Sequence, residues 1–338
     1  MRKLASIRKI DRIDPIKDAD AIEVATLGGW KVVIRKGEFK EGDLAVYLEI
    51  DSWVPYELAP FLSKGKDPRE FNGVKGERLR TVKLRGQLSQ GLLLSLEGLE
   101  PLAARNFSED QDISNELRIQ KWEAPINAQL AGEVRGSFPG FVPKTDQERI
   151  QNLAYLLPEL NGRYFEFTEK LDGSSMTIYN RDGEIGVCSR NLDLKENYDN
   201  SFWKVAKDMG LLEKISTLSN LAFQGELIGP GIQKNPYKLP KHEFRLFDIY
   251  DISAGEYLTP EKRRDLADNL EILHVPVITI RKLGPEDTME SLIAKADGRS
   301  FMNPMDFKLV REGLVLKSMD GGCSFKVISN EFLLKGGD

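Results

Sequence analysis

Hydrophobic and polar residues alternate in short runs along the first 120 residues of the chain. The clearest runs are AIEVATLGG, WKVVIRKG, DLAVYLEIDSWVP, RLRTVKLRG and GLLLSLEGL. Alternation with a period of two, interrupted by turn residues, is typical of strands that have one buried face. About five such strands predict a small closed β-barrel, of which the OB-fold is the five-stranded example. Another small β-sandwich is the alternative that this pattern leaves open.

The pattern changes after residue 120. Residues 121–146 are rich in proline and glycine and have no sustained periodicity, which predicts a connector between domains. The segment TDQERIQNLAYLLPEL then predicts a helix with Thr145 or Asp146 as N-cap and Glu148 in its first turn. Two further helical patterns, SFWKVAKDMGLLEKI and PEKRRDLADNLEI, are interspersed with strands, and no GxxxxGK[ST] loop occurs. This order predicts an α+β domain with antiparallel sheets and peripheral helices.

Length and composition agree with two folded domains. The chain has 338 residues, of which 41% are hydrophobic and 30% charged, and this length exceeds that of one typical domain. We predict an α+β protein with an OB-like nucleic-acid-binding domain at 1–120, a linker at 121–144 and a larger domain at 145–338. No apolar run approaches the roughly 20 residues that span a bilayer, and no apolar segment of a signal peptide follows the first residues. The expectation is an intracellular protein, cytoplasmic or nuclear.

Cysteine and histidine are too few for several kinds of site. Cys188 and Cys323 are far apart and form no CxxC pair, which fits a reducing compartment and argues against a thiolate zinc site. His242 and His274 are the only histidines. A Ser-His-Asp hydrolase and a histidine-rich metal site are therefore disfavoured, and both histidines are predicted to be structural.

The net charge of −5 does not indicate a nucleic-acid-binding protein, but the charge is unevenly distributed. Residues 61–90 carry eight Lys and Arg against three acidic residues. Four of these cations, Arg78, Arg80, Lys83 and Arg85, lie in one strand-like run. Such a surface suits the phosphates of a nucleic acid. The alternative is an edge strand that its charges keep soluble.

The segment EFTEKLDGSS contains the strongest candidate for chemistry. Lys170 ends a strand-like run, and the Asp172-Gly173 step that follows is a turn signal. The continuation SSMTIYNRDGEIGVCSR predicts a hairpin. A turn at residues 180–183 would pair Tyr179 with Glu184, and another turn type would shift this register by about two residues. Either register returns Arg190 towards Lys170, which suits an anionic ligand; a surface cluster of ion pairs is the alternative.

Three later segments add candidate groups. FQGELIGPGI places Glu226 at the end of an apolar strand, before a Gly-Pro-Gly loop that lets backbone approach a ligand closely. FRLFDIYDI is an aromatic and apolar run around Phe247, and a buried strand is a sufficient explanation for most of it. REGLVLKSMDGGCSFKVIS predicts another hairpin, with Glu312 on one arm and Lys326 on the other.

Together, in this order, these segments resemble the covalent nucleotidyltransferase superfamily of ATP-dependent ligases and capping enzymes. KLDG resembles its nucleophile motif, GELIG its second carboxylate motif and LFDIYD its base-stacking strand. EGLVLK resembles its metal-site glutamate motif and SFKVIS its final lysine motif. Ser175 stands where capping enzymes and DNA ligases usually carry an arginine, whereas SRN at 189–191 and PKTDQERIQN resemble the RNA ligase branch.

The N-terminal half narrows the resemblance further. It is similar to that of the nick-sealing RNA ligases with an N-terminal OB domain, the Deinococcus and Naegleria type, so that the resemblance covers essentially the whole chain. One feature departs from the family pattern: many relatives end with two lysines spaced Lys-x-Lys, whereas Val327 and Ile328 follow Lys326 here. Lys317 or Lys335 is the candidate for the missing charge.

The resemblance implies an ATP-dependent RNA ligase whose larger domain is an ATP-grasp-like nucleotidyltransferase. Lys170, Asp172 and Lys326 would be catalytic, with Lys170 as the nucleophile that becomes lysyl-AMP. The groups expected to contact the nucleotide are Glu169, Arg149, Arg190, Glu226, Phe247 and Lys326. The metal ligands implied are Glu312, Asp172 and Glu226, for Mg²⁺ or Mn²⁺. The partner expected is RNA in a nicked duplex with a 5′-phosphate and a 3′-OH, bound by a monomer.

Elementary acid–base chemistry supports the need for a metal. Free lysine has a pKa of roughly 10.4, so almost none of it is nucleophilic at neutral pH, and the neighbouring Asp172 favours the ammonium form further. A divalent cation is the largest positive charge that such a site could hold. Three alternatives stay open: a capping guanylyltransferase, a DNA ligase and a non-catalytic RNA-binding protein.

Overall fold

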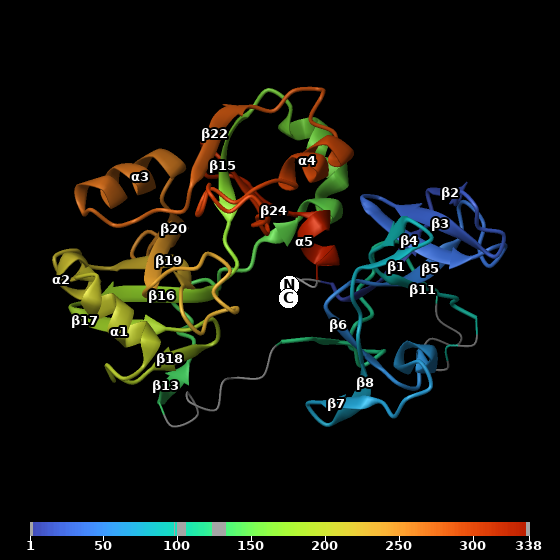
Figure 1. The fold of residues 1–338 in the computed structure, drawn as a ribbon, viewed down its shortest axis with the longest axis horizontal. Coiled ribbons are helices and arrows are strands. Elements are labelled where there is room, and N and C mark those ends of the chain that lie inside the picture. Colours follow the sequence, from blue (N-terminus) through green and yellow to red (C-terminus); the bar gives the residue numbers. More distant parts are fainter. Residues whose placement is uncertain (1–2, 98, 100–105, 124–132, 336–338) are drawn as a thin grey trace. The chain divides into compact units, whose positions relative to one another are not determined.

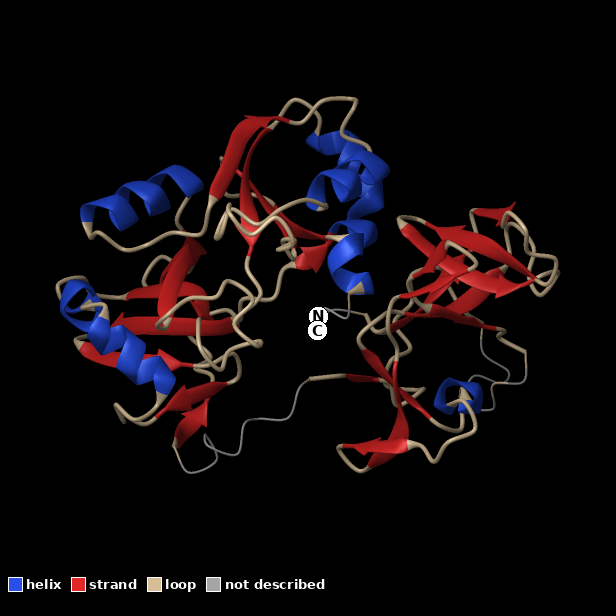
Figure 2. Cartoon of the chain, in the orientation of Figure 1, coloured by secondary structure: helices blue, strands red, loops and turns tan. Residues whose placement is uncertain are grey.

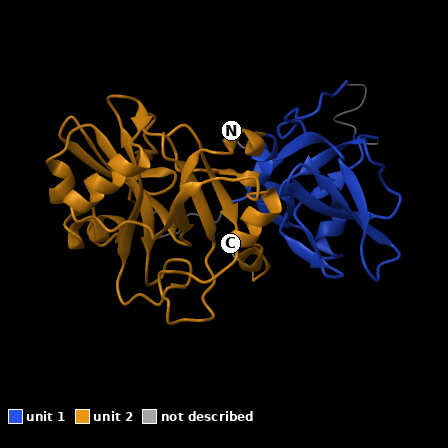
Figure 3. Cartoon of the chain, turned by 90° about the horizontal axis from the view of Figure 1, so that it is seen from above, with its two compact units in different colours: residues 1–125, 151–155 blue, residues 126–150, 156–338 orange. Residues whose placement is uncertain are grey.

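The computed structural model describes residues 3–97, 99, 106–123 and 133–335. The chain divides into two compact units (Figure 3): unit 1 comprises Met1–Pro125 with Gln151–Tyr155, and unit 2 comprises Ile126–Ile150 with Leu156–Asp338. Of the predicted linker at 121–144, residues 124–132 lie outside the described residues. Strands predominate in both units (Figure 2). None of the described helices has the length and apolar character needed to cross a lipid bilayer.

Unit 1 is built from short antiparallel strands that surround an apolar core. Its sheets have the orders β1-β5-β11, β2-β3-β4, β12-β6-β8-β7 and β9-β10. The bounds are β1 (Ala5–Lys9), β2 (Arg12–Pro15), β3 (Ile22–Leu27), β4 (Trp30–Arg35), β5 (Leu44–Leu48), β6 (Ser52–Pro55), β7 (Arg69–Phe71), β8 (Val74–Arg78), β9 (Val82–Leu84), β10 (Gln87–Ser89), β11 (Leu92–Leu94), β12 (Gln120–Lys121) and the short 3-10 helix η1 (Pro60–Ser63). The core includes Ile7, Val46, Leu48 and Val54, which are almost wholly buried.

Two of the predicted strands of unit 1 are each divided. The run DLAVYLEIDSWVP forms β5 and β6, separated by a turn in which Asp51 has a φ of 68°. The run RLRTVKLRG does not form a single strand: β8 ends at Arg78, and β9 begins at Val82. The alternation of this run therefore does not place its four cations on one face.

Unit 2 contains two sheets, with the orders β13-β18-β17-β16-β19-β20-β21 and β14-β24-β23-β15-β22 (Figure 1). The strands are β13 (Val134–Ser137), β14 (Glu148–Arg149), β15 (Tyr164–Lys170), β16 (Ser174–Arg181), β17 (Glu184–Cys188), β18 (Leu192–Leu194), β19 (Leu221–Ile228), β20 (Glu243–Asp251), β21 (Glu256–Tyr257), β22 (Val277–Lys282), β23 (Gly313–Ser318) and β24 (Ser324–Ile328). The helices are α1 (Ser201–Asp208), α2 (Leu211–Ser216), α3 (Pro260–Asn269), α4 (Met289–Ala296) and α5 (Asn330–Leu334), and the 3-10 helix η4 (Ile150–Leu160) is shared, because its residues Gln151–Tyr155 belong to unit 1. Mostly antiparallel sheets with peripheral helices confirm the α+β prediction.

Helices α1 and α2 cover one face of the seven-stranded sheet (Figure 1). The sequence predicts one helix here, but the chain breaks at Gly210, which has a φ of 64°. This left-handed conformation ends α1 and lets α2 start at a new angle. Trp203 and Ile215 of the two helices reach the same apolar core as Phe223 of β19, so the core of the sheet depends on the break.

The predicted helix start at Thr145 or Asp146 is wrong. Residues Glu148–Arg149 form β14, which pairs in parallel with β24 so that Arg149 lies opposite Lys326. The 3-10 helix η4 begins only at Ile150 and has no side-chain cap. The edge of β24 provides backbone hydrogen-bond partners for this segment, and a helix signal read from neighbouring residues does not include them. Ser324 of β24 also donates a hydrogen bond of 2.7 Å to Gln147.

The hairpin of β16 and β17 forms with the shifted register. Asp182 and Gly183 make a two-residue turn with φ values of 52° and 89°, the positive angles of a type I′ turn. Arg181 therefore pairs with Glu184, and Tyr179 pairs with Gly186. This register differs by two residues from the one in which Tyr179 faces Glu184.

Candidate active site

Lys170 lies at the end of β15, where the two sheets of unit 2 meet. It pairs with Gly313 of β23, and this register places its ammonium beside the residue before Gly313. Lys170 Nζ lies 2.5 Å from Glu312 Oε1, and the lysine side chain keeps 27% exposure. The lysine is thus paired with a carboxylate from a distant part of the chain, yet stays open to an incoming group.

The next residues carry the chain from one sheet to the other. A Cβ atom at Gly173 would lie only 2.6 Å from the carbonyl oxygen of Leu227, so the backbone can approach β19 this closely only with glycine. β16 then starts at Ser174, and Ser175 pairs with Glu226 of β19. Asp172 and Glu226 are brought together beside Lys170 by this crossing.

The electrostatics of the site depend on one amine among three carboxylates. Burial alone lowers the pKa of Lys170, but the charges of Glu312, Glu226 and Asp172 and the hydrogen bond to Glu312 outweigh burial and raise it above its usual value. Burial raises the pKa of Glu226 to about 8; the charge of Lys170 opposes this shift, and Glu312 and Asp172 add to it. Without further positive charge, Lys170 is an ammonium at neutral pH and not a nucleophile.

The same carboxylates suit a hard divalent cation. Their oxygens are the donors that Mg²⁺ and Mn²⁺ prefer, and such ions usually keep waters or phosphate oxygens among their ligands. Within the described ranges, no three His, Cys, Asp or Glu side chains converge closely enough to hold a metal ion alone. The donor set therefore fits a cation that is shared with water and a bound phosphate, and not a closed protein cage.

Phe247 lies at a bulge in β20. The pairing with β19 runs from Gln224 opposite Asp248 to Gly225 opposite Leu246, which leaves Phe247 as the extra residue. A bulge re-aims a side chain relative to the sheet, and Phe247 is half-buried among apolar residues that include Leu171 and Tyr237. The ring therefore lies close to the nucleophile segment, where the sequence predicts a base-stacking residue.

A buried ionic network lies beneath Phe247. Lys317 donates to the carbonyl oxygen of Phe247 over 2.7 Å and forms an ion pair with Asp248 at 2.5 Å. Burial lowers the pKa of Lys317 to about 8, partly offset by the charge of Asp248. Both contacts of the Lys317 ammonium are therefore with β20. Lys335 pairs with Glu331 on α5 at 2.8 Å, with both side chains about half exposed.

Arg263 joins that network from α3. Its guanidinium is wholly buried and contacts Glu166 of β15, and it also donates to Nε2 of His274 over 3.0 Å. Burial and the charge of Arg263 lower the pKa of His274 to about 3, so the imidazole is neutral. The network links the nucleophile strand β15 to β20 and β23.

The other predicted site residues are distributed as follows. Arg149 is buried and adjacent to Lys326 in the strand register, so the two candidate phosphate ligands are neighbours. Arg190 is exposed and pairs with Asp146 at 2.6 Å, and its charge offsets a part of the rise that burial causes in the pKa of Glu226. The Glu169 carboxylate faces away from open solvent and accepts from the Ser300 hydroxyl and, over 2.7 Å, from the backbone N–H of Phe301.

Tyr237 is a site residue that the sequence analysis missed. Its buried hydroxyl accepts a hydrogen bond of 2.6 Å from the backbone N–H of Asp172. The only sequence signal is its position in the loop GIQKNPYKLP after Glu226, which does not mark it as functional. The contact holds the turn between Lys170 and Gly173 in place.

The four predicted nucleic-acid contacts of unit 1 do not form one surface. Arg78 is buried, pairs with Asp51 at 2.8 Å and stacks over the ring of Trp122 at 3.8 Å. Arg80, Lys83 and Arg85 are exposed. The expectation that Arg78 contacts phosphate needs correction, because its charge is engaged inside the unit.

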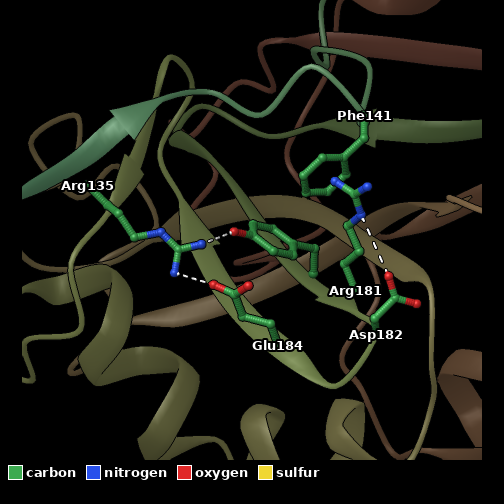
Figure 4. Close-up of a pocket in the computed structure, with 6 residues that line it drawn as sticks. Arg135, Phe141, Arg181, Asp182 and Glu184 are labelled. Carbon is green, nitrogen blue, oxygen red and sulfur yellow. Dashed lines mark hydrogen bonds and ion pairs between the residues drawn. The ribbon is translucent and has the colours of Figure 1, made fainter.

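A pocket of about 340 Å³ lies at the turn end of the β16–β17 hairpin (Figure 4). It is lined by Arg135, Phe141, Tyr179, Arg181, Asp182 and Glu184. Arg135 donates to the Tyr179 hydroxyl over 2.6 Å and pairs with Glu184 at 2.9 Å. These hydrogen bonds and ion pairs join polar groups of the pocket to one another. None of the lining residues is a predicted site residue.

Comparisons with known proteins identify both units. An RNA ligase family model matches residues 163–328, and an OB-fold domain model matches residues 4–96. Among solved structures, an RNA ligase of Naegleria gruberi in complex with PPi is 46% identical over 98% of each chain, with a TM-score of 0.90. A mutant of that ligase with ATP and Mn matches over 100% of each chain at a TM-score of 0.91, and another with AMP and Mn over 98% of each chain at 0.90, both at 46% identity. The comparison with curated protein sequences gave no match. The predicted OB-like fold is thereby confirmed.

Proposed function

The chain belongs to the RNA ligase family, and from this premise we propose that it is an ATP-dependent ligase that seals RNA through a lysyl-AMP intermediate. The observation that carries the proposal is the ammonium of Lys170, 2.5 Å from Glu312 and within the field of Glu226 and Asp172. The Naegleria gruberi structures with ATP and Mn, with AMP and Mn and with PPi support the same ligands for this chain.

In the first step, Lys170 Nζ attacks the α-phosphorus of ATP. A P–N bond forms, the bond from the α-phosphorus to the bridging oxygen breaks, and pyrophosphate leaves while the amine loses its proton. Glu312, Asp172 and Glu226 would hold a Mg²⁺ or Mn²⁺ ion, whose charge favours the neutral amine and offsets the charge of the phosphates. Lys326 supplies fixed positive charge at the α-phosphate, where negative charge develops in the transition state. The neighbouring Arg149 binds the outer phosphates of ATP.

The adenine and ribose need separate contacts. Phe247, re-aimed by its bulge, stacks on the adenine, and Glu169, the residue before Lys170, is a further nucleotide contact that the motif implies. Glu226 meets the ribose hydroxyls or serves as the third carboxylate around the metal. Arg190 contacts AMP or the 5′-phosphate of the RNA. Each of these assignments follows from the position of the residue around Lys170 and from its motif.

In the second and third steps, the RNA ends react. An oxygen of the 5′-phosphate attacks the AMP phosphorus, the P–N bond to Lys170 breaks, and an adenylylated 5′ end results. The 3′-OH of the neighbouring strand then attacks that 5′-phosphate and AMP leaves. A nick in a duplex presents both ends side by side, and the exposed Arg80, Lys83 and Arg85 of unit 1 suit the phosphates of the duplex.

The test offers labelled ATP, GTP or NAD with metal to the wild-type and Lys170→Ala proteins. A covalent AMP adduct from ATP alone, absent from Lys170→Ala, is expected. A GMP adduct would indicate a capping enzyme, and no adduct in the wild type would leave only an RNA-binding protein. The adenylylated protein is then given nicked duplexes with RNA or DNA at the 3′-OH side. Equal sealing of both would indicate a DNA ligase.

A further inference from the structure

Residues 298–311 form a loop that exposes large apolar side chains. Phe301 is 51% exposed, Phe307 65% and Met305 81%. The loop is closed at its base by backbone hydrogen bonds of 3.0 Å from Ser300 to Leu309 and from Arg311 to Gly298. Exposed apolar groups gathered in this way mark an interaction site more often than single surface residues do.

This aromatic loop is rooted at the candidate active site. The Ser300 hydroxyl and the Phe301 N–H both donate to the carboxylate of Glu169, the residue before Lys170. Met302 and Leu309 pack in the apolar cluster that also contains Phe247. The exposed rings are therefore carried by a segment whose inner side borders the nucleotide site.

A second loop, residues 229–242, lies against the same segment. Besides the bond between the Tyr237 hydroxyl and the Asp172 N–H, the Gln233 amide donates to the Gly173 carbonyl oxygen over 3.4 Å. Gln233, Lys234 and Asn235 have consecutive φ values of 43°, 59° and 50°. Non-glycine residues in this conformation cost energy and occur preferentially at functional sites. Lys238 pairs with Asp306 at 2.6 Å, so the two loops are joined.

The two loops are strongly basic in a chain of net charge −5. Together they carry six Lys and Arg against a single acidic residue, Asp306. Lys234, Lys241 and Lys308 are exposed, and the guanidinium of Arg299 stacks over the Phe307 ring at 4.5 Å. Positive charge interleaved with exposed aromatic rings is the combination by which proteins bind the bases and backbone of a single nucleic-acid strand.

We propose that this two-loop surface, residues 229–242 and 298–311, binds an RNA strand at the ligation junction. Bases at the strand end stack on Phe301 and Phe307, and the phosphates meet Lys234, Lys241 and Lys308. The surface thereby positions the RNA end beside Lys170 without taking part in ATP chemistry. This inference rests on the proposed ligase function and adds the residues that grip its substrate.

The experiment separates RNA binding from adenylylation. Phe301→Leu/Phe307→Leu keeps apolar bulk but removes both rings, and Lys234→Ala/Lys241→Ala/Lys308→Ala removes the charges. The matched controls are Tyr164→Ala, an equally exposed ring at the opposite end of β15, and Lys262→Ala on α3. AMP-adduct formation is measured without RNA. The Kd for a nicked RNA duplex is measured at several salt concentrations in a Lys170→Ala background.

We expect all four variants to form the AMP adduct at the wild-type rate. The ring variant weakens RNA binding roughly tenfold or more, the order of effect of removing the partner of a stacked base. The charge variant lowers the slope of log K against log salt by about 0.7–0.9 for each phosphate that is no longer bound, the range between single strands and duplexes. RNA affinity unchanged in both variants, or an equal weakening in the controls, overturns the proposal. Failure of the ring variant to form the adduct overturns it too, because the loop would then build the nucleotide pocket.

Two further outcomes would assign the surface or the protein a different role. If the rings serve a second protein copy, the wild type self-associates in sedimentation while the ring variant does not, and RNA affinity is unchanged; this overturns the proposal. If neither the wild type nor any variant forms an AMP adduct, the ligase proposal fails. The RNA affinities still test the two-loop surface in that case, because they are measured in the Lys170→Ala background and do not depend on adenylylation.

Discussion

Replacing Glu312 by glutamine should make Lys170 more reactive towards a neutral electrophile while it abolishes AMP transfer. The substitution keeps the shape of the side chain and removes the charge 2.5 Å from Nζ. A hydrogen bond to a charged group contributes about 1.5–3 kcal/mol, which corresponds to roughly one to two units of pKa. The fraction of neutral Lys170 at pH 7 should therefore rise about 10- to 100-fold in metal-free protein.

The assay is acylation of the apo protein with a small uncharged reagent in the presence of a chelator. Modification of the peptide that contains Lys170 is followed by mass spectrometry. Glu331→Gln, which breaks an exposed pair on α5, is the matched control and should leave Lys170 labelling unchanged. AMP-adduct formation by Glu312→Gln should fall by orders of magnitude, because the metal loses a ligand. Unchanged or slower acylation would refute the conclusion that Glu312 holds the proton on Lys170.

Three further predictions concern the support of the site. Because the pKa of His274 is about 3 when folded and roughly 6.5 when unfolded, the unfolded chain binds the extra proton, and stability falls as pH drops from about 6.5 towards 3. At pH 5 the decrease is about 2 kcal/mol relative to pH 7; urea unfolding should show it in the wild type and not in His274→Gln, and equal decreases would contradict it. Arg263→Met leaves the fully buried Glu166 poorly compensated and should cost about 3–5 kcal/mol in the same assay, whereas replacing both residues by apolar ones should cost less; an equal cost for the single and double variants would contradict this. Phe247→Ala should weaken ATP binding to Lys170→Ala protein by about 1–3 kcal/mol in calorimetry, on the scale of base–aromatic stacking, and Phe247→Trp should restore it; a normal Kd for Phe247→Ala would exclude stacking.

Much of this protein could be predicted from local patterns. The period-two runs placed β3 and β4, the strand-like run that ends at Lys170 placed β15, and the Asp182-Gly183 step placed a hairpin turn. Each of these signals depends only on neighbouring residues. The order of the motifs around Lys170 placed the chain in its family. These signals depend on neighbouring residues or on the order of motifs along the chain. They can be recognised without knowing which strands pair.

Other features depended on partners distant in the chain. Arg149 left its predicted helix because the edge of β24 was available to pair with it. Arg78 became buried because Asp51 and Trp122 surround it, although its sequence neighbours suggest an exposed basic strand. Sequence propensity is a weak guide wherever a tertiary partner competes with it.

By itself, the sequence determined which groups the site contains: an amine, three carboxylates, a ring and a set of cations at the ends of strands. Only the tertiary structure decided how they meet. The contact of Lys170 with Glu312 follows from the register of β15 on β23, and the position of Phe247 follows from one extra residue in β20. The physical reason is that register is a property of two strands together, and one residue of slip would turn every side chain to the opposite face.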